Sequence, residues 1–266
     1  MSPYEITWID IAIAASLVLI NGVISFTLRL GLGKSLLIGS IRTIVQLSLI
    51  GLILRWVFAL DNVFIVLGIL LMMTTVAAFS VKGRMPVIYT GLFQDTFIAI
   101  FLPSWVILFI GVNIVLHVEP WYKPQYIIPI AGMIIGNVLT GVSLVMDRLL
   151  SELKDKQGEI ETLITLGATS WEAYEKRAKK AIKAGMMPTI NSMMVVGLVS
   201  LPGMMTGQVL AGQDPEQAVR YQIMMMFFLT ATTGLACILV VFAVFKRIFN
   251  KNGVFLSQRL IDIKTS

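Results

Sequence analysis

The sequence predicts an all-α, polytopic integral membrane protein with about seven transmembrane helices. Of its 266 residues, 57% are hydrophobic and only 14% are charged, and the mean hydropathy is +0.85. Soluble domains carry charge at about 25% of positions, so this chain has too little polar surface to fold in water. The composition therefore excludes a soluble enzyme, a disordered protein and a disulfide scaffold. The single cysteine, Cys237, cannot form an internal bridge.

Seven stretches have the length and composition of membrane spans, because a helix needs about 20 mostly apolar residues to cross a bilayer. They are residues 8–28, 36–54, 63–81, 92–116, 126–146, 189–210 and 218–245. None alternates apolar and polar residues as the strands of a membrane β-barrel do. We expect a single transmembrane domain over residues 1–266.

The basic residues indicate how these spans are oriented. Arg55, Lys123 and Arg220 fall on the side of the N-terminus, and Arg42 lies within a span. The rest of the 21 lysines and arginines follow the first, third, fifth and last spans. Connections rich in Lys and Arg face the cytoplasm, which predicts an outside N-terminus and a cytoplasmic C-terminus. The net charge of +6 is thus a topology signal, and we expect a lipid bilayer but no nucleic acid as partner.

One connection, residues 147–187, is long and polar and follows the fifth span. Apolar residues recur in it at helical spacing up to Gly167, and Thr169 or Ser170 is suited to cap a second helix. We expect two short cytoplasmic helices joined by a turn at Gly167-Ala168. One interpretation is a basic amphipathic segment that rests on anionic lipid. We favour a docking element for a cytoplasmic protein, because seven spans need no further membrane anchor.

Several runs of residues resemble a known family. Glu161, six residues before Gly167, resembles the cytoplasmic coupling loop of ABC-transporter permeases. A closer resemblance covers almost the whole chain and lies in residues 40–47 (SIRTIVQL), 165–169 (TLGAT), 188–194 (PTINSMM) and 200–208 (SLPGMMTGQ). These runs are similar to the Fet-type (FetB-like) permease family, which includes iron exporters and relatives of plant aluminium-tolerance permeases.

The resemblance implies a multi-pass permease of the cell inner membrane, a homodimer driven by a separate cytoplasmic ABC ATPase. It also implies export of metal ions, iron among them. The residues that it implies for coupling to the ATPase are Glu161, Leu166, Gly167 and Ala168.

The chain itself is not expected to be an enzyme. Gly33-Lys34-Ser35 matches only the end of a P-loop, and Leu28 stands where that motif requires its first glycine. We therefore expect no cofactor in this chain, and ATP with Mg²⁺ only in the partner subunit.

Polar residues inside spans are candidates for a translocation pathway. Arg42 and Gln46 share one face of the second span, and Asp95 begins the fourth span at its cytoplasmic end. Arg42 either extends to the cytoplasmic surface or faces protein, and we predict that it forms an ion pair with Asp95 or shares a polar network with it.

The span at 189–210 is unusual because Pro202-Gly203 lies near its middle, where proline disrupts the preceding helical turn. Broken helices often form the substrate site of transporters, whereas the alternative is a simple packing kink. Our further pathway candidates are Asn191, Pro202, Gly203, Met204, Met205 and Gln208. Methionine thioethers bind soft metals but also pack adaptably, so the sequence does not define a metal site.

Two other classes of function compete with a permease. An ion-gradient-driven secondary transporter or channel is disfavoured by the scarcity of carboxylates inside the spans. A membrane scaffold that transports nothing is disfavoured by the polar break at Pro202.

Overall fold

The structure is a computed structural model that describes residues 7–60, 62–250 and 252–262. Its described residues confirm the all-α, multi-pass fold class. Six of their helices are long and apolar enough to cross a membrane: α1 (Trp8–Thr27), α2 (Gly33–Leu60), α3 (Val63–Lys82), α4 (Leu92–Ile110) with its π-helical extension (Gly111–Val115), α5 (Pro124–Asp155) and α9 (Pro215–Ile248). The shorter elements are β1 (Val87–Ile88), α6 (Gln157–Thr165), α7 (Ser170–Val195), α8 (Gly203–Leu210), a 3-10 turn (Ser257–Arg259) and β2 (Ile261–Asp262).

The span that we expected at residues 189–210 is wrong as a continuous helix. Helix α7 begins far earlier, in the polar segment, and ends at Val195; the chain then turns before α8 starts at Gly203. Gly197 has a φ of +83°, which side chains disfavour, and Pro202 has no amide hydrogen to donate. The break is therefore a full interruption and not a kink. The orientation of the termini stays a prediction.

The helices form two compact units, each described by itself. The first unit comprises the residues up to Asn62 together with Leu210–Gly212, and the second comprises the remainder. Our expectation of one transmembrane domain over the whole chain stays a prediction.

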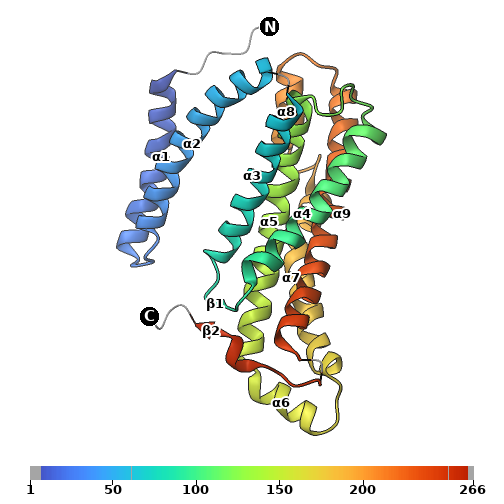
Figure 1. Ribbon diagram of the computed structural model, residues 1–266. Coiled ribbons are helices and arrows are strands. Elements are labelled where there is room, and N and C mark those ends of the chain that lie inside the picture. The colour runs from blue at the N-terminus through green and yellow to red at the C-terminus, as the bar shows by residue number, and fades with distance from the viewer. Residues whose placement is uncertain (1–6, 61, 251, 263–266) are drawn as a thin grey trace. The chain divides into compact units, whose positions relative to one another are not determined.

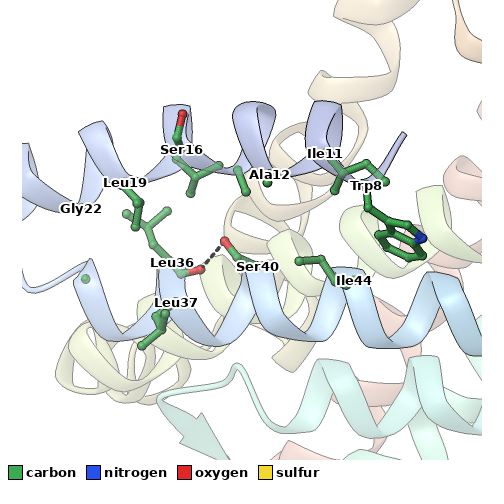
Figure 2. Close-up of a pocket in the computed structure, with 13 residues that line it drawn as sticks. Trp8, Ile11, Ala12, Ser16, Leu19, Gly22, Leu36, Leu37, Ser40 and Ile44 are labelled. Atoms are coloured by element: carbon green, nitrogen blue, oxygen red, sulfur yellow. Dashed lines mark hydrogen bonds between the residues drawn. The ribbon is translucent and has the colours of Figure 1, made fainter. Parts of the chain in front are cut away.

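The first unit is built on the α1–α2 hairpin. Thr7 caps α1 and shares a reciprocal capping box with Asp10, and the Ser25 hydroxyl accepts a hydrogen bond from the Leu32 amide in the connecting turn. Side chains of both helices line a pocket of about 490 Å³, as Figure 2 shows. The hydroxyls of Ser16 and Ser40 donate to carbonyls of their own helices. The pocket therefore offers an apolar surface.

The second unit packs α3, α4, α7 and α9 around the long helix α5 (Figure 1). The two short strands pair antiparallel, with Val87 opposite Asp262, and they lie at the same end of the unit as α6. We call this end the α6 end and the opposite one the α8 end. The connections that follow α3, α5 and α9 thus meet at one end, as the basic residues predicted. Lys251 and Lys264 of that set lie outside the described residues.

Helices α5 and α7 approach each other most closely at Gly141 and Gly185. A Cβ placed on Gly185 would lie 2.7 Å from the carbonyl oxygen of Gly141 and would overlap the Val145 side chain. One turn away, the Asn137 side-chain amide donates to the hydroxyls of Thr189 on α7 and Thr233 on α9, at 2.9 and 3.0 Å. Small residues and hydrogen bonds between helices are the interactions that hold helices together in lipid.

This contact generates a first prediction. We expect Gly185→Ala to lower the free energy of unfolding by about 1–3 kcal/mol, because the added methyl group forces two backbones apart. The control is Gly136→Ala on α5, whose Cβ would meet nothing within 4 Å. Thermal unfolding in one detergent measures both, and equal unfolding midpoints would contradict the prediction.

Candidate functional site

The polar segment forms a tight helical hairpin of α6 and the first turns of α7. Gly167 adopts a φ of +97° after the end of α6, its amide donates to the Ile164 carbonyl, and the Ala168 amide donates to that of Leu163. This is the Schellman arrangement that glycine favours at helix ends. Thr169 then caps α7 in a capping box with Glu172. The predicted turn at Gly167-Ala168 and the Thr169 cap are thus confirmed, although α7 is long and not short.

The base of this hairpin is fixed to the rest of the unit. The hydroxyl of Tyr174, which is fully buried, donates to the Val241 carbonyl on α9 at 2.7 Å. Trp171 stacks on Phe242 of the same helix with 5.3 Å between ring centroids. Arg177 of α7 is buried and pairs with Glu159 of α6 at 3.2 Å. The base of the hairpin is therefore held against α9, and α6 is held against α7.

The tip of the hairpin presents the residues expected to couple to an ATPase. Glu161 and Gly167 are exposed, and Ala168 is half-buried. The Glu161 carboxylate accepts a hydrogen bond from the Gln157 side chain on its own helix. Leu166 is 79% exposed, so an apolar side chain projects from a polar surface. Such a residue is suited to enter a pocket on another protein.

At the other end of α7, the break creates a short helix between two cavities. After Val195 the Gly197 amide donates to the Ser200 carbonyl, and the chain continues through Pro202 into α8. Met204 and Gln208 line a cavity of about 480 Å³ on one side. Met205 lines a second cavity of about 490 Å³.

The two cavities are lined by similar polar and sulfur-containing side chains. The first also contains Gln125, Tyr126, Met133, Gln213 and Tyr221, and the second contains Met193, Gln222 and Met226. The side-chain oxygens of Gln208 and Gln222 are buried and have no hydrogen-bond partner among the described residues. Both linings therefore include amide and thioether groups, the first also includes two phenols, and neither includes a carboxylate.

The other sequence-predicted residues lie elsewhere. Pro202 precedes α8 and Gly203 begins it, but neither lines a cavity, and Asn191 is exposed on α7. Arg42 and Gln46 are exposed on α2 of the first unit.

Asp95 is buried at the α6 end, where its partner is a residue that we did not predict. The Arg247 guanidinium of α9 contacts both Asp95 oxygens at 3.0 to 3.2 Å. The Tyr89 hydroxyl donates to the same carboxylate at 2.9 Å. Burial, and then the negative charge of Asp95, raise the pKa of Tyr89 far above its ordinary value, so the phenol stays protonated as a donor. The expected Arg42–Asp95 pair stays a prediction, because Arg42 belongs to the other unit.

The residues that fix the hairpin were also missed. Arg177 looked like one more topology charge, yet its side chain is only 5% exposed. Its spacing from the apolar residues of α7 is the one available signal: Ala173, Tyr174, Ala178 and Ala181 place Arg177 on the buried helix face.

The model of the family described as "Uncharacterised protein family (UPF0014)" matches residues 8–249. The chain belongs to the UPF0014 family. It is a multi-pass membrane protein of permease-like type.

Three relatives span most of the chain. A UPF0014 membrane protein of Synechocystis is 41% identical over 81% of this chain and 83% of its own length. The probable iron export permease protein FetB of Escherichia coli is 34% identical over 98% of this chain and 99% of its own. The Arabidopsis thaliana protein ALUMINUM SENSITIVE 3 is 30% identical over 90% and 86%. No solved structure matches the chain. The expected family is thus confirmed.

The capping box predicts a pH dependence. Hydrogen bonds from the amide and hydroxyl of Thr169 hold the pKa of Glu172 below its ordinary value of 4.5. The stabilising contribution of Glu172 is therefore present above that value and is lost as the pH falls through the lowered pKa. Glu172→Gln removes this dependence while keeping an acceptor. We expect the difference in thermal midpoint between wild type and variant to shrink on acidification; a constant difference from pH 7 to pH 3 would contradict this.

The Asp95–Arg247 ion pair predicts that substitutions of these two residues have coupled effects on stability. We expect Arg247→Gln to lower the free energy of unfolding by about 1–3 kcal/mol, less than the 3–5 kcal/mol of a fully buried pair, because the Arg247 side chain is 39% exposed. In a double-mutant cycle, the addition of Asp95→Asn to Arg247→Gln should restore part of the lost stability, because the buried negative charge is then removed as well. The same cycle with Arg42→Gln tests the pair predicted from the sequence. Additive effects of the Asp95 and Arg247 changes would argue against the observed pair.

Proposed function

We propose that this UPF0014 protein is the membrane-spanning subunit of an ATP-driven exporter of metal ions, with iron as the first candidate cargo. In this proposal two copies form the membrane part, and each binds one cytoplasmic ABC ATPase through the α6–α7 hairpin. ATP and Mg²⁺ belong to the ATPase, and this chain supplies the pathway.

The observation that carries the proposal is the construction of the hairpin. Its tip exposes Leu166 and Glu161, whereas its base is locked to α9 by Tyr174 and Trp171. A segment that only rested on lipid would need no such rigid attachment. The name of the Escherichia coli relative, a probable iron export permease, supports the cargo and the direction.

The pathway in this proposal runs beside α8. Because α7 is continuous from the hairpin to Val195, closure of the ATPases would shift the break at residues 196–202 and repack α8. Met204, Met205 and Gln208 would then change which cavity is open, an alternating-access mechanism in which a broken helix forms the site.

Flux measurements test the function. The chain is reconstituted into vesicles with the α6–α7 hairpin facing outward, with and without a candidate ABC ATPase from the same organism, and Fe²⁺ entry into the vesicles is followed after Fe²⁺ and ATP are added outside. An exporter moves its cargo away from the ATPase side, so we expect entry only with both ATPase and ATP. Entry without ATP would indicate a gradient-driven transporter or channel, and no entry together with no ATPase binding would indicate a scaffold.

The hairpin generates a mutational prediction. We expect Leu166→Asp to weaken ATPase binding about tenfold or more, the effect of losing a buried apolar anchor. ATP-dependent flux should fall in parallel. Ile261→Asp is the matched control, because Ile261 is a 53% exposed apolar residue at the α6 end that lies outside the hairpin. Equal binding of both variants to the ATPase would place the docking surface elsewhere.

A further inference from the structure

A groove lies between α4 and α9 at the α6 end of the second unit, away from the hairpin tip and from α8. Its volume is about 480 Å³. Ile98 and Ala99 come from one wall, and Leu239 and Phe242 come from the other. Of these residues only Phe242 also takes part in the attachment of the hairpin, through its stacking on Trp171.

The groove has an apolar body. Ile98 is 51% exposed, and Leu239 and Phe242 are also exposed, although all three belong to helices that cross the membrane. From Leu239 to Arg247 the α9 wall is about 12 Å long at 1.5 Å per residue. This length matches a substantial part of one lipid acyl chain running along the helix.

The end of the groove is cationic. Lys246 is exposed and forms no ion pair with any described residue. Arg247 uses its Nε and Nη2 for Asp95, and its Nη2 also donates to the Gln94 side chain at 3.2 Å. Arg259 does not line the groove itself, but it donates to the Arg247 carbonyl at 2.6 Å, which brings another exposed guanidinium beside the same turn of α9.

The single carboxylate of the groove does not cancel this charge. Asp95 is 8% exposed at its side chain and is already held by Arg247 and Tyr89. The positive charges of Lys246 and Arg259 therefore stay available to a ligand.

We propose that this groove binds an anionic phospholipid, with one acyl chain along Leu239 and Phe242 and the phosphate at Lys246 and Arg259. The apolar strip matches the acyl chain of this ligand, and the cations at the end of the membrane helix match its phosphate. Basic pockets between transmembrane helices recognise lipid head groups in this way. A zwitterionic lipid lacks the net charge, and a soluble phosphate makes no use of the apolar body. The inference does not depend on the proposed transport function.

Thermal unfolding in a mild detergent tests the proposal with three additives: dioleoyl phosphatidylglycerol, dioleoyl phosphatidylcholine and soluble glycerol phosphate. We expect saturable stabilisation by phosphatidylglycerol only. Equal stabilisation by phosphatidylcholine would overturn the proposal, and so would an equal effect of glycerol phosphate, which would indicate a simple anion site.

Variants locate the site. The double variant Lys246→Gln, Arg259→Gln leaves the Asp95–Arg247 pair intact and should weaken phosphatidylglycerol binding about 30-fold. Lys176→Gln, an exposed lysine on α7, is the control and should have no effect. Ala243→Phe fills the groove without changing a charge and should also reduce binding. Unchanged binding in the double variant, with wild-type circular dichroism and elution volume, would overturn the proposal.

Discussion

The close approach of α5 and α7 at Gly141 and Gly185 is the contact on which the larger unit depends. In lipid the helices gain little from hiding apolar surface from one another, since lipid tails are equally apolar. Their association must come from close packing and from hydrogen bonds. Two glycines bring the backbones together, and Asn137 then reaches hydroxyls on α7 and α9. Three helices are thereby held as one body.

Helix α7 connects the hairpin to the break beside the two cavities. It is 26 residues long, about 39 Å, and it carries the hairpin at one end and the break at the other. Tyr174 and Arg177 fix its beginning, whereas the residues after Val195 have few neighbours: Leu198 and Val199 are 90% and 82% exposed. Strain applied at the fixed end is therefore expected to be relieved at the loose end, beside the two cavities.

The sequence predicted those features that local chemistry determines. The apolar composition predicts membrane spans. A glycine at 167, which can adopt a positive φ, followed by the capping residue Thr169 predicts the hairpin turn. The sequence did not predict the features that depend on tertiary structure. Residues 189–210 are apolar enough for a span, but average hydropathy does not detect the reversal at Gly197. The partner of Asp95 is 152 residues away in sequence, and nothing near either residue indicates that they meet.

The neutral lining of the two cavities bears on what a permease of this kind must achieve. A cage of carboxylates would bind a multivalent cation strongly and would release it slowly. Passage instead requires binding that is favourable enough for entry and weak enough for exit. Among the described residues the buried oxygens of Gln208 and Gln222 have no hydrogen-bond partner, so a cation or water that reaches them gains their interaction without meeting a full negative charge. The lack of carboxylates in the two linings is thus compatible with a metal cargo, provided that the cargo is passed on and not stored.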